Sequence, residues 1–381
     1  MPHPATRAVH GSDCKDRTFN SVMTPLYPSS TFAYDRIGEH RGFDYTRSGN
    51  PTRRVLEDTL ASLEGGSACV CTATGMAAVA AGLYLLKPGD HVITGNDIYG
   101  GSYRLMHDVF SRYGIEFEFI DMTDPARVKD AIRRETALIW IETPSNPMLR
   151  LVDIQAVTEL AREREILTAV DNTFMTPCFQ RPFELGADII VHSTTKYING
   201  HSDVVGGAIV TNRPDLDERI AFIANACGLT ESPWDAWLVL RGVQSLAPRM
   251  QAHAAGAEKI AAWLDRHPKV LKTYFPGLPS HPQIELAKRQ MTGFGGMVTF
   301  QIDADKEELD RFFGALRYFS LAESLGGVES LIESPWYMSH MSMSEQARRE
   351  AGITTGTIRV SVGLENADDL IEDLENGLKA I

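Results

Sequence analysis

Short apolar runs alternate with helix-like stretches through the middle of the chain, from about residue 68 to residue 212. Between the runs, apolar side chains recur every three or four residues, as on one face of a helix. The runs that we expect to be strands are SACVCTAT, DHVITGN, IEFEFID, ALIWIET and ILTAVDN. Strands that alternate with helices imply right-handed crossovers and a sheet buried on both faces. We therefore predict an α/β fold with a mostly parallel central sheet and helices on both faces.

A smaller α/β unit follows towards the C-terminus. A long helical stretch, DAWLVLRGVQSLAPRMQAHAAGAEKIAAWLDRH, is expected to be interrupted at Pro248 and to link two domains. Strand-like GMVTFQID and TIRVSVGLE then alternate with helical EELDRFFGAL and DDLIEDLENGLKAI. Residues 1–55 are rich in Pro, Ser and Thr and show no sustained period. The predicted division is an N-terminal arm at 1–55, a large domain at 56–245 and a small C-terminal α/β domain at 246–381.

Charge and cysteine content narrow the class of function. The net charge of −13, without a long Lys/Arg run, argues against a nucleic-acid partner. The cysteines are odd in number and never spaced as CxxC, so neither a disulfide framework nor a metal site is indicated. They are Cys14, Cys69, Cys71, Cys178 and Cys227. No apolar segment is as long as a membrane span, and the N-terminus has no apolar signal-peptide core. We therefore expect a cytoplasmic enzyme that acts on small molecules.

Lys196 is the most unusual side chain in the sequence. It follows the apolar run Ile189–Val191 and stands among the hydroxyls of Ser193, Thr194 and Thr195. A lysine after a strand is most often a solvated turn cation, but here its neighbours form a potential anion site. A lysine amine beside an anion site is what Schiff-base chemistry with a phosphorylated aldehyde cofactor requires.

Other candidate residues follow separate predicted strands. Ligands of parallel sheets bind at the carboxyl ends of the strands, so one pocket is expected to collect these residues. Gly75 and Met76 open a helix whose first N–H groups suit a phosphate, although a glycine at a tight turn often has only a steric role. The set is Gly75, Met76, Tyr99, Asn146, Asp171, Ser193, Thr195 and Lys196.

Arg359 lies inside an otherwise apolar predicted strand. Two interpretations stay open: an ion pair with a nearby acid, or a bidentate clamp on a substrate carboxylate. Neither GxGxxG nor GxxxxGK[ST] occurs in the positions that would support them, which weakens the case for a nicotinamide-dependent oxidoreductase or a P-loop nucleotidase. A catalytically silent scaffold with this fold is a further alternative.

Eight motifs, taken together, resemble the Cys/Met-metabolism family of pyridoxal-phosphate enzymes, which has the fold type I transferase architecture. They recur in the family's order from about residue 20 to the C-terminus, so the resemblance covers nearly the whole chain. The motifs are YTRSGNPTR, ATGMAA, DIYGGSYR, ETPSNP, DNTF, HSTTKYINGHSDVVGG, AESLGGVESL and IRVSVGLE.

The resemblance implies a role for each candidate residue. Lys196 would attach pyridoxal 5′-phosphate and move protons, Asp171 would pair with the ring nitrogen, and Tyr99 would stack on the ring. The phosphate would be held by Gly75, Met76, Ser193 and Thr195, joined by Tyr45 and Arg47 from a neighbouring subunit. The substrate would contact Arg359, Asn146, Ser324, Glu323 and Tyr45.

Within the family the motifs YGGSYRL, TGMAA and GFGGM are most similar to cystathionine γ-synthases, with cystathionine γ-lyases second. The first implies γ-replacement of an O-acylhomoserine by cysteine, the second γ-elimination of cystathionine. Glu323 resembles the acidic residue of γ-specific members, and Gly101 stands where methionine γ-lyases carry cysteine, so β-lyase and methionine γ-lyase activities are less expected. Trp336 and Tyr337 depart from the family pattern and either reshape the pocket or pack outside it. A homotetramer built as a dimer of dimers, with sites shared between subunits, is also implied.

Overall fold

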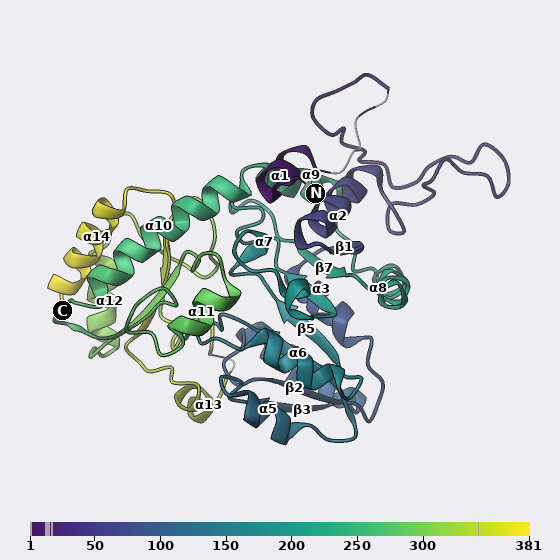
Figure 1. Cartoon of the computed structure of the whole chain (residues 1–381). Helices are drawn as coiled ribbons and strands as arrows, with labels where there is room; N and C mark the ends of the chain where they lie inside the picture. The colour runs from purple at the N-terminus through teal and green to yellow at the C-terminus, as the bar shows by residue number, and fades with distance from the viewer. Residues whose placement is uncertain (1, 12–15, 17, 342) are drawn as a thin grey trace.

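The computed structural model describes residues 2–11, 16, 18–341 and 343–381, so Cys14 lies outside the described residues. The chain forms two sheets, each covered by its own helices, and a segment between α1 (Pro4–His10) and α2 (Pro51–Glu64) extends away from them (Figure 1). This arrangement confirms the predicted α/β class with a second, smaller sheet.

The larger sheet has the order β1-β7-β6-β5-β4-β2-β3. Its neighbours pair in parallel except that β7 runs antiparallel to both β1 and β6. The sheet is therefore mostly parallel, as predicted, and six strands present their carboxyl ends at one edge. The strands are β1 (Ala68–Thr72), β2 (His91–Gly95), β3 (Glu116–Ile120), β4 (Thr136–Glu142), β5 (Leu167–Asp171), β6 (Ile189–His192) and β7 (Gly207–Thr211).

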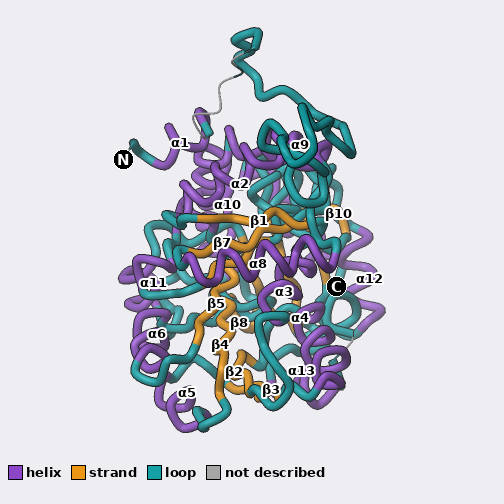
Figure 2. Tube along the Cα trace, turned by 90° about the vertical axis from the view of Figure 1, so that its right-hand side faces the viewer, coloured by secondary structure: helices purple, strands orange, loops and turns teal. Residues whose placement is uncertain are grey.

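Helices cover both faces of this sheet, because successive apolar side chains on each strand point to opposite faces (Figure 2). On β6, Ile189 and Val191 pack towards α3 and α8, while Ile190 packs towards α2 and α9. The helices and shorter helical turns are α3 (Gly75–Leu83), α4 (Gly100–Arg104), η1 (Leu105–Val109), η2 (Phe110–Tyr113), α5 (Pro125–Ala131), α6 (Ile154–Arg162), α7 (Thr176–Phe179), η3 (Pro182–Leu185), α8 (Pro214–Cys227) and α9 (Pro233–Gln244).

The smaller sheet has the order β10-β11-β12-β9-β8 and is antiparallel except for the β10–β11 pair. Phe300 of this sheet packs edge-on against Phe312 in a core closed by the first, third and last helices of this region. The strands are β8 (Val270–Tyr274), β9 (Met297–Ile302), β10 (Ser320–Leu321), β11 (Leu331–Glu333) and β12 (Thr357–Ser361). The helices are α10 (Leu246–Leu264), α11 (Ile284–Gln290), α12 (Lys306–Gly314), α13 (Glu345–Glu350) and α14 (Ala367–Lys379).

The break in the long connecting helix does not fall at Pro248, so that prediction is wrong. Helices α9 and α10 are separated at Ser245, and Pro248 lies in the first turn of α10. A proline is tolerated there because the first N–H groups of a helix have no acceptor within it. Within the unpatterned stretch 1–55, the described residues include the short helix α1, whose Ala8 is buried against α2, and the first turn of α2 itself. Helix α1 is too short to show a period.

Two absences apply to the described residues. None of their helices is long and apolar enough to cross a membrane. They also bring no three His, Cys, Asp or Glu side chains together in a way that would bind a metal ion.

Close packing between α9 and the segment after Lys196 generates a stability prediction. A Cβ added to Gly242 would lie 2.1 Å from the carbonyl oxygen of Asn199, a backbone atom that cannot move aside cheaply. We expect Gly242→Ala to lower the free energy of unfolding by about 1–3 kcal/mol, as overpacking of a tight contact does.

Gly314 provides the matched control, since a Cβ at this helical glycine would meet nothing within 4 Å. Gly314→Ala should therefore leave stability unchanged or raise it slightly, because alanine is the better helix former. Equilibrium denaturation of both variants checks this; equal stabilities for the two would contradict the packing argument.

Candidate active site

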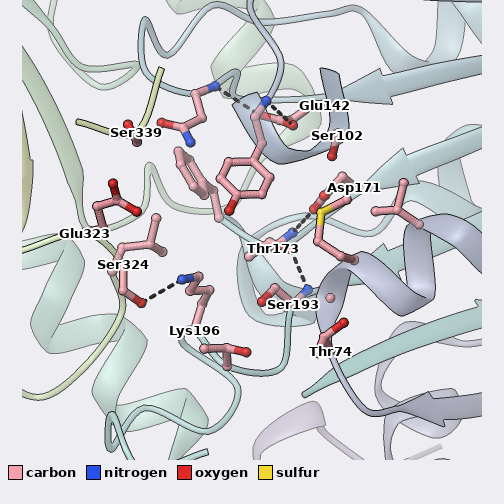
Figure 3. A pocket seen from close by; sticks show the side chains of 18 of the residues that line it. Thr74, Ser102, Glu142, Asp171, Thr173, Ser193, Lys196, Glu323, Ser324 and Ser339 are labelled. Atoms are coloured by element: carbon pink, nitrogen blue, oxygen red, sulfur yellow. Dashed lines mark hydrogen bonds between the residues drawn. The ribbon is translucent and has the colours of Figure 1, made fainter. Parts of the chain in front are cut away.

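A cavity of about 370 Å³ lies at the carboxyl ends of the parallel strands, and the smaller sheet and its loops close its other side (Figure 3). Every predicted site residue except Tyr45 and Arg47 lines it, although these residues come from distant parts of the sequence. The predicted residues at the cavity are Gly75, Met76, Tyr99, Asn146, Asp171, Ser193, Thr195, Lys196, Glu323, Ser324 and Arg359.

Lys196 occupies the turn that follows β6, where its backbone N–H bonds to the carbonyl of Ser193. Its Nζ donates to Ser324 Oγ at 2.6 Å. Burial, followed by the positive charge of Arg359, lowers the pKa of Lys196 to about 8. Ser324 has a φ of +88°, an unusual backbone conformation for a residue other than glycine and one often found at functional sites. The amine is thus both held in place and poised to lose its proton near neutral pH.

Asp171 ends β5 and is connected to the lysine turn by hydrogen bonds. Its Oδ1 accepts from the N–H of Thr173 at 3.0 Å, and Thr173 Oγ1 accepts from the N–H of Ser193 at 2.9 Å. Burial raises the pKa of Asp171, so a nearby cation would stabilise its ionised form. This carboxyl is suited to pairing with a protonated ring nitrogen.

The N-terminus of α3 packs tightly on the same turn. Thr74 caps the helix by accepting from the N–H of Ala77 at 2.9 Å. A Cβ at Gly75 would lie 2.8 Å from Ser193 Cβ, so only glycine allows this approach. Free N–H groups at the start of α3 and the Ser193 hydroxyl together form an anion cradle. The Thr195 hydroxyl is already engaged, because it donates to the carbonyl of Gly206 at 3.1 Å and accepts from its N–H at 2.9 Å.

Tyr99 immediately precedes α4 and forms a second wall of the cavity. A Cβ at Gly101 would lie 2.4 Å from the edge of the Tyr99 ring, so a side chain at position 101 would displace the ring from this position. Burial, with the charge of Glu323 as the next cause, raises the pKa of Tyr99 and keeps its hydroxyl protonated.

For Arg359 the structure shows the ion pair, while the carboxylate clamp stays a prediction that its position at the cavity allows. Arg359 pairs with Glu333, the residue opposite it on β11, at 3.0 Å, and it also lines the cavity. Its Nη1 donates to Asn146 Oδ1 and its Nη2 to the Ser324 carbonyl, both at 2.9 Å. Arg359 Nε is buried and has no hydrogen-bond partner among the described residues.

Tyr45 and Arg47 are not brought into this cavity. Both are exposed on the extended segment, with the Arg47 guanidinium 5.7 Å from the centre of the Tyr45 ring. Trp336 and Tyr337 also lie outside the cavity lining. Trp336 packs with Met148 and beneath the Arg348 guanidinium, so these aromatics contribute to the core.

Several residues at the cavity were missed by the sequence analysis. Glu142 is the last residue of β4, and the rule that ligands bind at strand ends could have found it. Thr173 lies within the DNTF motif, two residues after Asp171. Ser339 follows no predicted strand, and only the folded chain brings it to the cavity.

Comparison with known proteins shows the family to which the chain is similar. Residues 5–379 match the model of the family described as Cys/Met metabolism PLP-dependent enzyme. Cystathionine beta-lyase of Coxiella burnetii is 48% identical over 99% of this chain and 98% of its own. Cystathionine gamma-lyase of Bacillus subtilis is 46% identical over 99% of both chains. The structure of cystathionine gamma synthase from Xanthomonas oryzae pv. oryzae in complex with cystathionine superposes with a TM-score of 0.97, at 47% identity, over 100% of this chain and 98% of that one.

The cavity fits the cofactor of that family, pyridoxal 5′-phosphate. An aldehyde needs an amine, a phosphate needs an anion cradle, and a pyridine nitrogen needs a carboxyl group. Lys196, the start of α3 with Ser193, and Asp171 provide these three groups around one cavity. Their individual roles remain predictions.

The lowered pKa of Lys196 yields a reactivity prediction. Only the neutral amine is nucleophilic, so acylation of Lys196 in cofactor-free protein should speed up with pH and level off above about 8. The reference compound is Nα-acetyl-lysine, whose free ε-amine has an ordinary pKa. Its rate of acylation should continue to rise up to about pH 10.4. Peptide mass spectrometry after limiting acylation measures the rate; a profile for Lys196 that matches Nα-acetyl-lysine would contradict the assignment.

Proposed function

Because the chain belongs to the Cys/Met metabolism family of PLP-dependent enzymes, we propose that it catalyses γ-replacement of an O-acylhomoserine by cysteine, which yields cystathionine. The observation that supports this most is the acidic side chain of Glu323 on the cavity wall. The family itself establishes a PLP-dependent enzyme of sulfur amino acid metabolism. The particular reaction, γ-replacement, is what we propose.

Glu323 stands next to Ser324, the residue that binds Lys196, and faces the cavity (Figure 3). Burial and the charge of Arg359 lower the pKa of Lys196, and the negative charge of Glu323 partly offsets that shift. Burial raises the pKa of Tyr99, and the charge of Glu323 adds to that increase. A carboxylate there would attract the ammonium group of an amino acid that extends past the first substrate. Both an incoming cysteine and the distal half of cystathionine carry such a group.

The bound cofactor supplies an electron sink next to the substrate's α-carbon. Lys196 Nζ, with a pKa of about 8, can take a proton from a substrate carbon and return it near neutral pH. Asp171 would keep the ring nitrogen protonated, and Tyr99 would stack on the ring and exclude water. Gly75, Met76 and Ser193 would hold the phosphate, with Thr195 supporting the lysine turn.

The substrate's α-carboxylate would bind to Arg359 with help from Asn146 and Ser324. Glu333 and Asn146 hold Nη1 of the guanidinium and the Ser324 carbonyl holds Nη2, which reduces the conformational freedom lost on binding.

The second candidate is γ-elimination of cystathionine to cysteine, 2-oxobutanoate and ammonia. It uses the same lysine and the same clamp, and the similarity to a protein named cystathionine gamma-lyase supports it. A β-lyase activity is supported by the similarity to a protein named cystathionine beta-lyase but receives less support from the acidic Glu323.

Product analysis of the purified enzyme tests the proposal. With O-succinylhomoserine or O-acetylhomoserine plus cysteine, we expect cystathionine as the main product. With cystathionine alone we expect slow release of 2-oxobutanoate and little pyruvate, the ketoacid of β-elimination. Rapid cleavage of cystathionine without synthesis would reject γ-replacement, and the ketoacid formed would identify the lyase.

We further propose that active sites are shared within a homotetramer made of two dimers. Phe19 and Ile37 on the extended segment are 87% and 105% exposed, which is costly for apolar side chains unless another subunit covers them. Val205, which lines the cavity, is itself 60% exposed and leaves that wall open to a partner. Tyr45 and Arg47 of one subunit would then join the phosphate site of the next. The free state of the described cysteines fits a cytoplasmic location.

Co-expression of two inactive variants tests whether sites are shared. Lys196→Ala and Arg47→Ala subunits should each be nearly inactive alone. If Arg47 serves the neighbouring subunit, each mixed dimer regains one intact site, so the mixture should recover about one quarter of wild-type activity. Activity no higher than that of the separate variants would show that Arg47 acts within its own subunit or not at all.

A further inference from the structure

Glu142 is a buried acid that lines the cavity and that none of the proposed roles uses. It ends β4, is only 8% exposed, and pairs in register with Asp171 on β5. Burial, followed by the negative charge of Asp171, raises its pKa well above the ordinary value. The ionised form of the carboxyl group is therefore unfavourable at this position unless specific partners compensate for the lost hydration.

Each oxygen of Glu142 has such a partner. Oε2 accepts from the backbone N–H of Tyr99, and Oε1 accepts from that of Asn146, both at 3.0 Å. Figure 3 draws both bonds converging on this side chain. The first donor belongs to the loop after β2 and the second to the loop after β4.

The two loops held by Glu142 have different proposed tasks. Tyr99 provides the wall on which the cofactor ring would stack, and Asn146 holds Arg359, the proposed carboxylate clamp, through its Oδ1. Cofactor wall and substrate clamp are thus connected through one carboxylate that needs to touch neither ligand.

We propose that Glu142 is a positioning residue. Its two oxygens hold the loop of Tyr99, the proposed cofactor wall, and the loop of Asn146, which supports the proposed substrate clamp, in fixed positions relative to each other. This inference rests on the roles proposed above for Tyr99 and Asn146. A carboxylate suits the task because it has two acceptors and no obligatory donor. An amide has one acceptor, so its NH₂ group would face one of the two N–H donors without a bond. An alanine would leave both N–H groups unpaired.

Two dissociation constants, measured on the holoenzyme, test the proposal. One is that of pyridoxal 5′-phosphate, from its absorbance on dilution; the other is that of L-alanine, from the spectral change on titration. We expect Glu142→Ala to raise both by about tenfold, the equivalent of one lost hydrogen bond each. Tyr99→Ala should raise only the first constant and Asn146→Ala only the second.

Glu142→Gln is the variant to use where Glu142→Ala does not fold. It preserves the side-chain volume and one acceptor, so at least one of the two constants should rise about fivefold or more. The proposal is overturned if the Glu142→Ala variant changes neither dissociation constant, or only one of the two. It is also overturned by a Glu142→Gln variant in which neither constant changes.

Asp373 supplies the matched control for general destabilisation. It is 2% exposed and accepts from the backbone N–H groups of Arg317 and Tyr318 at 2.8 Å, away from the cavity. Asp373→Asn should lower the melting temperature and leave both constants within about twofold of wild type; parallel changes in both constants would overturn a specific role for Glu142. Both constants can be measured whether or not the enzyme performs γ-replacement, so failure of that activity is distinguishable.

Discussion

The hydrogen-bonded ion pair of Arg359 is the interaction on which the rest of the site depends. Arg359 belongs to β12 of the smaller sheet, yet its Nη1 donates to Asn146 in the loop after β4 of the larger sheet. The same guanidinium pairs with Glu333 and donates to the Ser324 carbonyl. Removing one member would leave a buried charge without its partner, typically a loss of about 3–5 kcal/mol. The two sheets are therefore tied together at the cavity that they enclose.

Burying these polar groups at the cavity costs free energy of folding, which the apolar core must offset. Lys196, Asp171 and Glu142 line one cavity, and burial disfavours the ionised form of each of these three side chains. Ser324 adds backbone strain with its φ of +88°. Apolar clusters on both faces of the larger sheet and within the smaller one supply the opposing free energy. Buried titratable groups and backbone strain of this kind are expected at a site where binding and proton transfer are required.

The fold and cofactor site are common to relatives with different activities, so neither selects the reaction. β-lyase, γ-lyase and γ-synthase relatives are similar to this chain at 46–48% identity. We propose that the reaction is selected where the second half of a substrate would reach, beyond Lys196 and the proposed carboxylate clamp. Glu323 and Ser339 line the cavity and would face that part of the substrate. Trp336 is directed instead into a core cluster, so its bulk does not narrow the cavity.

Local pattern was enough for the sequence to determine the strand and helix alternation, the parallel sheet and the position of Lys196 at a strand end. Ligands of parallel sheets bind at the carboxyl ends of the strands, and this rule correctly predicted that Tyr99, Asn146 and Asp171 line one cavity. The reason is that both faces of such a sheet are covered by helices, so polar side chains are found at the ends of the strands. The motifs added the family, and with it Arg359 and Ser324 as cavity residues.

Only the tertiary structure decided which groups pair across the cavity. Arg359 and Asn146 are 213 residues apart and Lys196 and Ser324 are 128 apart, and no local period connects such positions. The strand-end rule could have found Glu142 itself, but not its two hydrogen bonds to the backbone N–H groups of Tyr99 and Asn146. Pairings of this kind follow from strand register and from how the two sheets pack, since a side chain's partners are set by geometry that the whole chain must first build.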